Sequence, residues 1–282
     1  MGGHARAVRG IPEGEEAAAV IVGGCDVGSL TSKAVIMEGG KVLGHALIKS
    51  RVKPGESAEE VMNMACAGAG LSSRDVAYCV GTGYGRDRIP FVGEAVSEIA
   101  CHGKGARWMV PSARTVIDIG GQDCKAIKLD GNGNMVKFIT NDKCASGTGR
   151  FLEVMARVLG VGLEELGELS ARARNPVILA NACTVWAQAD VIQHLNDGMP
   201  VEDIAAGINN AMASRMAVLV NNIGIERDVC MTGGVAKNGG VLAAIENQLG
   251  IRLKRIRRFD PQLAGAVGAA LFARERAGGG RV

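Results

Sequence analysis

The sequence lacks the features that mark membrane, secreted and nucleic-acid-binding proteins. No apolar run reaches the ~18 residues that a membrane span requires, and residues 1–19 lack the apolar segment of a secretory signal. The net charge of +3 is too small to favour a nucleic-acid partner, and no dense Lys/Arg run lies near the few aromatic residues. We therefore expect a cytoplasmic protein with no membrane and no nucleic acid among its partners.

Paired cysteine motifs and a Walker loop are absent as well. None of the eight cysteines belongs to a Cys-x-x-Cys pair, and in a reducing compartment they should be thiols or metal ligands instead of disulfides. No Gly-Lys-Ser/Thr follows an apolar strand pattern, which argues against a P-loop. The chain still has 282 residues, of which 47% are hydrophobic and 22% charged. That is enough for two domains with apolar cores, preceded by a loose extension over residues 1–19.

An internal repeat is the most informative pattern that is present. Two predicted hairpins, built on apolar runs within residues 18–37 and 116–129, share an acid, a glycine and a lysine at the same spacing. The matching residues are 92 positions apart: Asp26 and Asp118, Gly28 and Gly120, and Lys33 and Lys125. Two copies at this distance indicate two domains of one topology.

Each hairpin offers backbone N–H groups for phosphate oxygens and a carboxylate that can hold magnesium. A single hairpin of this kind is more often just a turn with a capping Asp. Two copies, together with a Gly233-Gly234 turn after the apolar run at residues 229–232, favour a nucleotide cleft.

Cys144 lies in a polar turn that precedes a predicted helix. The stretch from Thr140 to Leu159 reads TNDKCASGTGRFLEVMARVL, and its apolar residues from Phe151 onward recur at helical spacing. A thiol at a helix N-terminus faces unpaired backbone N–H groups and the positive end of the helix dipole. Both effects lower the pKa of the thiol and suit it to binding a metal-like group.

Several stretches resemble one family of ATPases. The hairpins and the segment MTGGVAKNGG (Met231 to Gly240) are similar to the sugar-kinase, heat-shock-70 and actin superfamily. Within it, IDIGGQDCKAI, NDKCASGTGRFLEVMARVL and NACTVWAQADVI resemble the activators of 2-hydroxyacyl-CoA dehydratases and the ATPase subunits of benzoyl-CoA reductase. The resemblance implies an α/β fold of two duplicated domains with a nucleotide cleft between them. We expect these domains at residues 20–112 and 113–259, with a C-terminal helix at 260–282 returning to the first.

The resemblance also implies an oxygen-sensitive iron–sulfur protein. One 4Fe–4S cluster would lie between the subunits of a homodimer or a pseudo-symmetric heterodimer, held by Cys144 and Cys183 of each. Two ligands per chain agree with a two-fold axis through the cluster, because a cubane needs four. Without the resemblance both cysteines would be interpreted as buried thiols, and the other six keep that interpretation. ATP hydrolysis would drive an electron from a donor such as ferredoxin or flavodoxin onto a CoA-thioester dehydratase or reductase.

The two hairpins are expected to hold ATP or ADP with Mg²⁺. Asp118 and Gln122 are the candidates for positioning the metal and the attacking water. The residues expected to bind the nucleotide are Asp26, Gly28, Ser29, Ser32, Gly120 and Gly121 at the phosphates and Gly233, Gly234 and Asn238 at the adenosine.

Other functions stay open on the sequence. Trp186 to Ala189 stands where the hydroxyacyl activators carry Phe-Ala-Glu-Ser, which leaves a benzoyl-CoA reductase as an alternative partner. A small-molecule kinase or a nucleotide-sensing scaffold of the same fold would need neither Cys144 nor Cys183. His102, predicted in a Gly-rich turn, and His194 are interpreted as structural instead of metal-binding.

Overall fold

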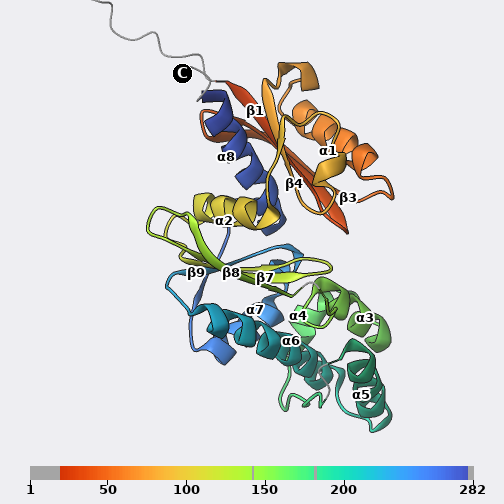
Figure 1. The fold of residues 1–282 in the computed structure, drawn as a ribbon. Coiled ribbons are helices and arrows are strands. Elements are labelled where there is room, and N and C mark those ends of the chain that lie inside the picture. The colour runs from red at the N-terminus through yellow and green to blue at the C-terminus, as the bar shows by residue number, and fades with distance from the viewer. Residues whose placement is uncertain (1–19, 142, 181–182, 279–282) are drawn as a thin grey trace, which may run out of the picture.

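The computed structural model describes residues 20–141, 143–180 and 183–278. Over these ranges the chain forms two five-stranded sheets with helices packed on their faces, and Figure 1 shows one sheet above the other. No helix in the described ranges is long and apolar enough to cross a membrane. The predicted extension at 1–19 and the last four residues of the predicted C-terminal helix lie outside the described residues.

The N-terminal sheet contains the first predicted hairpin. Its strand order is β3-β2-β1-β4-β5, in which β1 and β2 are antiparallel while β1 and β4 are parallel. The strands are β1 (Ile21–Val27), β2 (Thr31–Glu38), β3 (Lys41–Lys49), β4 (Tyr78–Thr82) and β5 (Glu94–Ala95). α1 (Pro54–Gly68) packs on one face and α8 (Ala264–Gly278) on the other. Because both faces are covered, β2 is apolar at consecutive positions, with Ala34 and Ile36 in one cluster and Val35 and Met37 in the other.

The C-terminal sheet repeats this topology. Its order β8-β7-β6-β9-β10 again joins an antiparallel meander to parallel strands through β6. The strands are β6 (Thr115–Ile119), β7 (Cys124–Leu129), β8 (Met135–Asn141), β9 (Val229–Thr232) and β10 (Leu253–Lys254). The largest buried apolar cluster joins this sheet to the helices α3 (Gly149–Leu159), α4 (Glu165–Ala171), α5 (Thr184–Asn196), α6 (Val201–Ile223) and α7 (Gly239–Leu249).

The helix α2 (Glu98–Met109) lies between the two sheets (Figure 1). It packs on α8 and also contacts β7, β8 and β9. The approach to α8 is close enough to exclude side chains, since a Cβ on Gly105 would lie 1.9 Å from the carbonyl oxygen of Ala264. His102 lies within this helix and is buried, so the prediction that it sits in a Gly-rich turn is wrong. The glycines around it allow the close packing of the helix.

Short 3₁₀ segments complete the elements, at Ser73–Asp75, Arg86–Arg88, Gly234–Lys237 and Pro261–Leu263. The helix α8 follows the last of these and packs on β1, β2 and β4 of the N-terminal sheet. That packing agrees with assigning the C-terminal helix to the first domain, and the exact domain boundaries stay a prediction.

Candidate functional site

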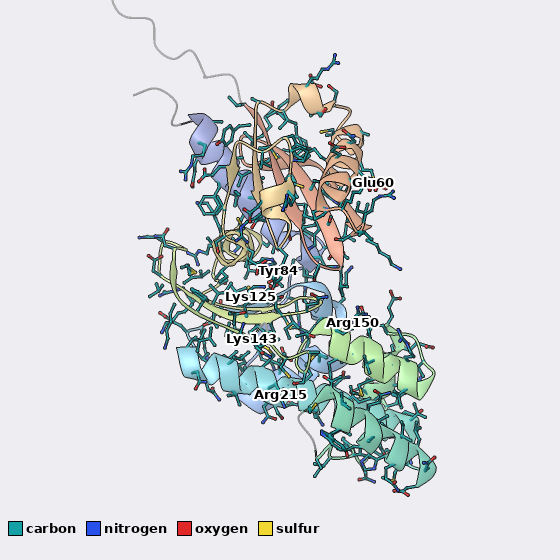
Figure 2. The ribbon with its side chains drawn as sticks, turned by 45° about the vertical axis from the view of Figure 1, so that its right-hand side comes forward. Glu60, Tyr84, Lys125, Lys143, Arg150 and Arg215 are labelled. Carbon is teal, nitrogen blue, oxygen red and sulfur yellow. The ribbon has the colours of Figure 1, made fainter. Side chains whose placement is uncertain are left out.

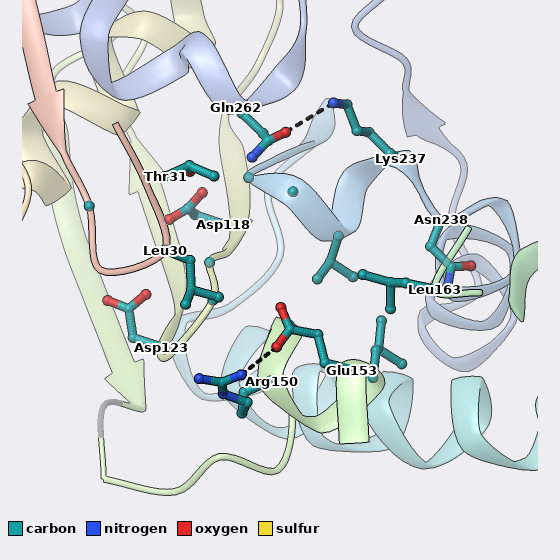
Figure 3. A pocket seen from close by; sticks show the side chains of 18 of the residues that line it. Leu30, Thr31, Asp118, Asp123, Arg150, Glu153, Leu163, Lys237, Asn238 and Gln262 are labelled. Atoms are coloured by element: carbon teal, nitrogen blue, oxygen red, sulfur yellow. Dashed lines mark hydrogen bonds and ion pairs between the residues drawn. The ribbon is translucent and has the colours of Figure 1, made fainter. Parts of the chain in front are cut away.

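A cleft of about 1210 Å³ runs between the two hairpins, along α4 and along the start of α3 and α7 (Figure 3). Eleven residues are predicted to bind the nucleotide or to position the metal and the water. Nine of them line the cleft: Asp26, Gly28, Ser29, Asp118, Gly120, Gly121, Gly233, Gly234 and Asn238. The other two do not. Ser32 is fully buried and its Oγ lies 2.9 Å from Ser50 Oγ, while Gln122 is exposed at the hairpin tip. Ser50 Oγ in turn donates a hydrogen bond of 2.7 Å to the carbonyl oxygen of Gly28. Ser32 is therefore connected to the backbone of the hairpin turn through Ser50.

The two hairpins that flank the cleft share one geometry. Asp26 is the cross-strand partner of Lys33, and Asp118 is the partner of Lys125. In both, the lysine Nζ contacts the aspartate Oδ2, at 3.1 Å in the first hairpin and 3.4 Å in the second. The turns match as well, since Gly28 N–H donates to Thr31 O at 3.1 Å and Gly120 N–H donates to Asp123 O at 3.0 Å.

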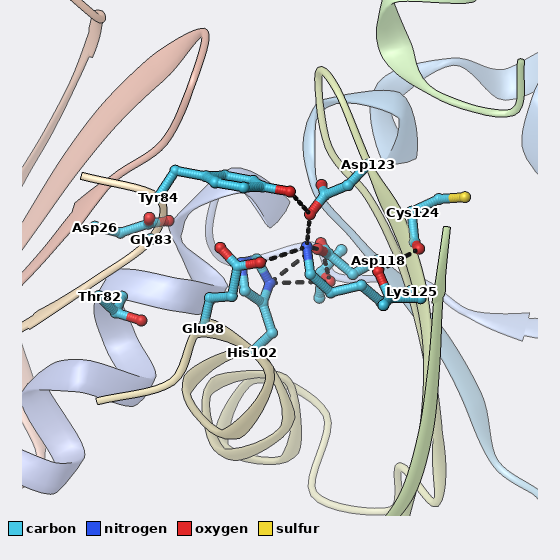
Figure 4. A network of polar contacts seen from close by, with 12 residues as sticks. Asp26, Thr82, Gly83, Tyr84, Glu98, His102, Asp118, Asp123, Cys124 and Lys125 are labelled. Atoms are coloured by element: carbon cyan, nitrogen blue, oxygen red, sulfur yellow. Dashed lines mark hydrogen bonds and ion pairs between the residues drawn. The ribbon is translucent and has the colours of Figure 1, made fainter. Parts of the chain in front are cut away.

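Around the second hairpin the structure adds side chains that sequence reasoning missed (Figure 4). Lys125 Nζ contacts Glu98 of α2 at 3.3 Å and pairs with Asp123 of its own hairpin. His102 Nδ1 lies 3.1 Å from Asp118 Oδ1, to which Thr232 also donates a hydrogen bond of 2.8 Å. No local sequence signal marks Glu98 or His102 as site residues, because α2 reaches the hairpin only through the tertiary packing.

The charges in this network support one another. Burial alone would raise the pKa of Asp118, but the charges of His102 and Lys125 and the hydrogen bonds from His102 and Thr232 hold it well below its usual range. Burial opposes the charged form of His102 too, and the neighbouring Asp118 carboxylate nevertheless raises the pKa of His102. The pKa of Lys125 is likewise raised against the effect of burial, by Asp118, Asp123 and Glu98. At neutral pH Asp118 is therefore a carboxylate held in place by cations.

Tyr84 joins the two sides of the cleft. It follows β4 of the N-terminal sheet, and its hydroxyl donates to Asp123 Oδ2 of the second hairpin at 3.3 Å. Figure 2 places Tyr84 and Lys125 together between the two sheets. Partial burial, aided by the charges of Asp123 and Glu98, raises the pKa of Tyr84 to about 12, so the hydroxyl keeps its proton at neutral pH.

The far end of the cleft is built from the turn after β9. Asn238 caps α7, where its Oδ1 accepts a hydrogen bond of 3.1 Å from the N–H of Val241. Lys237 Nζ donates to Gln262 Oε1 at 2.9 Å, as Figure 3 shows. The glycines of this turn present backbone instead of side chains to the cleft, so a flat group can lie against them.

Two of the eight cysteines differ from the rest. Cys144 and Cys183 are exposed, whereas the other six are buried. Cys183 immediately precedes α5, as predicted, but α3 begins only at Gly149, so Cys144 does not occupy its first turn. The pKa of Cys144 is lowered by a different cause from the predicted helix dipole, namely hydrogen bonding to the side chain and backbone of Ser146, whose Oγ lies 3.0 Å from the sulfur.

The cysteine turn and the second hairpin are connected through the start of α3. The N–H of Gly149 donates to the carbonyl oxygen of Gly120 at 2.8 Å, and the N–H of Arg150 donates to Gly121 O at 2.9 Å. The first two amides of the helix that follows Cys144 are thus bonded to the two glycines at the hairpin tip. A displacement of that tip must move the helix or break both hydrogen bonds.

The donor set of the cleft fits a polyphosphate better than a bare metal ion. Among the described residues no cluster of three or more His, Cys, Asp or Glu side chains could hold a metal. Asp26 and Asp118 each offer one carboxylate that a lysine already neutralises. Magnesium usually takes one or two protein carboxylates and completes its shell with phosphate oxygens and water. The residues present fit that mode, in which the nucleotide supplies most of the ligands.

The duplicated sheets, with a cleft between their hairpins, have the fold of the sugar-kinase, heat-shock-70 and actin class, as predicted. A ROK family glucokinase from Streptomyces griseus shares this fold at 16% identity, with a TM-score of 0.52 over 90% of this chain and 99% of that one. Residues 24–273 match the BadF/BadG/BcrA/BcrD ATPase family model. The chain belongs to this family.

Relatives of known name are similar over nearly the whole chain. An activator of lactoyl-CoA dehydratase from Anaerotignum propionicum is 45% identical, covering 90% of this chain and 97% of its own. A benzoyl-CoA reductase subunit from Thauera aromatica is 35% identical over 89% and 92% of the two chains. The solved activator of the 2-hydroxyisocaproyl-CoA dehydratase from Clostridium difficile, with bound ADPNP, has a TM-score of 0.87 at 41% identity, covering 92% and 96%.

Proposed function

We propose that this protein is an ATP-hydrolysing activator that delivers a low-potential electron to a 2-hydroxyacyl-CoA dehydratase. The observation that carries the proposal is the pair of hydrogen bonds from Gly149 and Arg150 to the carbonyl oxygens of Gly120 and Gly121. They join the hairpin assigned to phosphate binding to the first two residues of α3, the helix that follows the turn with an exposed cysteine.

The exposed thiols of Cys144 and Cys183 fit a metal cluster shared with a second subunit. Both are accessible, both lie at the approach to a helix of the same apolar cluster, and the pKa of Cys144 is already lowered. One chain thus presents two accessible thiols where a 4Fe–4S cluster needs four. Cys144 and Cys183 of two copies, or of this chain and a similar one, would hold it. Such a cluster supplies one-electron transfer at low potential.

In the cleft, the chain's own residues would bind and orient the nucleotide. The backbone N–H groups of the two turns would bind the phosphates, and Asp26 and Asp118 would help to hold Mg²⁺. The ion pairs hold both carboxylates in place before the nucleotide arrives. The glycines at 233 and 234 would lie against the adenosine. Gln122, exposed at the tip, stays the candidate for orienting water, and would have to turn into the cleft to do so.

The choice of partner follows from the similarity to known relatives. The dehydratase activator is 45% identical and the benzoyl-CoA reductase subunit 35% identical over comparable lengths. A permanent reductase subunit is therefore the second candidate, and a small-molecule kinase the third. Anaerobic affinity purification from the native cell, with mass spectrometry of the retained proteins, separates them. A dehydratase that is retained only during turnover supports the dehydratase activator. A reductase retained in stoichiometric amount supports the reductase subunit, and retention of neither protein supports the small-molecule kinase.

The cluster is tested by iron and sulfide analysis of protein purified without air. Cys144→Ser and Cys183→Ser should each abolish iron binding, since either change removes two of four ligands in a dimer. Cys124→Ser and Cys230→Ser, at buried positions, are the matched controls and should retain the cluster. A full iron content in either of the first two variants would disprove the shared site.

The connection between cleft and cysteine turn is tested on cluster-free protein. In a Cys183→Ala background, the rate at which Cys144 reacts with iodoacetamide is measured without nucleotide, with ADP and with ADPNP. We expect the rate to differ between these states, because the hydrogen bonds from α3 transmit movement of the hairpin tip. Asp118→Asn should remove the difference. Equal rates in all three states of the parent would leave an ATPase with two unconnected sites.

A further inference from the structure

Among the positively charged side chains that line the cleft, Arg150 is placed to respond to a ligand. Lys33 and Lys125 are buried in ion pairs with the hairpin aspartates, and Lys237 pairs with Asp260. Lys49 also lines the cleft, from the last residue of β3. Arg150 instead projects from the second residue of α3 into the cleft and is half exposed. Figure 3 shows its guanidinium on the side of the cleft where Leu30 and Asp123 lie, away from Asn238.

The backbone of Arg150 is anchored, while its side chain is held by an exposed ion pair. Its N–H donates to Gly121 O at 2.9 Å, which fixes the residue beside the tip of the second hairpin. Its guanidinium pairs with Glu153 Oε2 at 2.7 Å, and the two side chains in this ion pair are 46% and 31% exposed. Exposed pairs three residues apart on a helix contribute little to stability, so a stronger anion can take the guanidinium from Glu153.

We propose that Arg150 is the residue that recognises the terminal phosphate of ATP. This inference rests on the proposed ATP hydrolysis and names a residue that contacts the reacting group. With ATP bound, the guanidinium exchanges Glu153 for the γ-phosphate oxygens. During hydrolysis a water oxygen bonds to the γ-phosphorus and the bond to the β–γ bridging oxygen breaks. The electron pair stays on ADP, and the water proton passes to the released phosphate. Arg150 donates hydrogen bonds to the equatorial oxygens, over which the charge is spread.

The same contact distinguishes ATP from ADP. ADP carries no γ-phosphate, so Arg150 returns to Glu153 once phosphate has left. The anchored backbone of Arg150 belongs to the helix that follows Cys144, so the contacts made by this helix differ between the two nucleotide states. Glu153 acts as the resting partner, and its removal should favour the ATP-bound arrangement.

The test compares nucleotide binding and turnover in the full-length protein. Arg150→Gln should lower kcat for ATP hydrolysis about 10³-fold, the effect typical of losing a phosphate-binding arginine. It should weaken ADPNP binding at least about tenfold, as expected for a lost hydrogen bond to a charged group, and change the Kd of ADP by less than about twofold. Arg150→Lys should lie between the parent and Arg150→Gln, because Lys keeps the charge without the fork of donors. Glu153→Gln should bind ADPNP at least as tightly as the parent.

Two control variants make the result specific. Arg157→Gln removes an exposed arginine about two turns further along α3, outside the cleft, and should change neither Kd. Lys49→Gln removes another cation that lines the cleft. If Lys49→Gln, and not Arg150→Gln, abolishes the preference for ADPNP over ADP, the assignment to Arg150 is wrong. Equal weakening of ADP and ADPNP by Arg150→Gln would overturn it too, since the contact would then lie at the shared phosphates.

Failure of the proposed function would be visible separately. A parent protein that binds ADPNP more tightly than ADP but does not hydrolyse ATP would refute the ATPase role. The binding comparison would still decide whether Arg150 recognises the γ-phosphate. Thermal unfolding of each variant identifies any loss that comes from misfolding, and Arg150→Lys provides a variant that keeps the charge on α3.

Discussion

The two hairpins that border the cleft are copies with different surroundings. In each, an aspartate faces a lysine across the strands and a glycine closes the turn. The position occupied by Thr31 in the first hairpin is Asp123 in the second, which adds a carboxylate beside Lys125. The second hairpin also meets Glu98 and His102 of α2 and Tyr84 from the other side of the cleft.

This difference shows how one local design acquires two roles. The first hairpin is a minimal unit, in which a single lysine neutralises a single buried carboxylate. The second is the centre of a charged network that reaches both sides of the cleft and, through Gly120 and Gly121, the helix after Cys144. A movement between the two sides would therefore leave the contacts of Asp26 intact while it alters those of Asp123. We expect the second hairpin to sense closure and the first to bind without sensing it.

The largest effect should come from removing the two lysines. Lys125→Met leaves Asp118, Asp123 and Glu98 without their shared cation. Lys33→Met leaves one carboxylate, that of Asp26, without its ion-pair partner. Breaking a buried ion pair typically costs about 3–5 kcal/mol, and we expect Lys125→Met at the upper end and Lys33→Met at the lower end. Urea unfolding of both variants measures the difference. Equal losses would mean that the additional carboxylates are stabilised by solvent and not by Lys125.

Replacing the two aspartates tests whether both copies still serve the nucleotide. Asp118→Asn and Asp26→Asn should each reduce magnesium-dependent ATP hydrolysis about 10²–10³-fold, the effect typical of losing one preorganised polar group at a reacting centre. Iron content should not change, since the cysteines lie outside the cleft lining. Steady-state kcat with and without Mg²⁺ measures the effect. If one variant retained the parent rate, that copy would serve only to maintain the fold.

A smaller effect should follow from adding a methyl group to each turn. In Gly28→Ala the new Cβ would lie 2.8 Å from the backbone oxygen of Thr31, which cannot move without opening the turn. In Gly120→Ala it would lie 2.7 Å from Asp123 Oδ1, a side-chain atom that can shift more easily than backbone although Asp123 Oδ2 is paired with Lys125. We expect destabilisation of about 2 kcal/mol for Gly28→Ala and about 1 kcal/mol for Gly120→Ala, in the range of overpacked sites. Thermal unfolding of the two variants compares them, and the reverse order would show that Asp123 is the more rigid neighbour.

Tyr84→Phe should have the smallest effect on stability. Tyr84 is 54% exposed, and the change removes one hydrogen bond of 3.3 Å to Asp123. We expect a loss of about 0.5 kcal/mol in the free energy of unfolding. The variant should nevertheless alter the response of Cys144 alkylation to ADPNP, because it cuts a contact across the cleft. Tyr78→Phe, in the adjacent strand β4, is the control. An unchanged response in Tyr84→Phe would argue that closure is sensed elsewhere.

The strands and hairpins could be predicted because their signals are local. Alternating and continuous apolar runs define β1, β2, β6 and β7 within a few residues of their observed bounds. The seven-residue spacing of aspartate and lysine belongs to a hairpin in which the two residues face each other, and the repeat at 92 residues marks the duplication. The helical position of His102 could not be predicted in the same way, because glycines inside a helix are uncommon without close packing.

The sequence by itself determined the duplicated fold, the glycine turns and the family, because these depend on neighbouring residues and on motifs of consecutive residues. Only the tertiary structure decided which charges meet. Glu98 and His102 of α2, Tyr84 after β4 and Arg150 of α3 reach the cleft from three separate segments of the chain. It also decided that Cys144 and Cys183 are the exposed thiols among eight. The physical reason is that burial and ion pairing depend on distances in space, which helix packing sets and the spacing of residues along the chain does not.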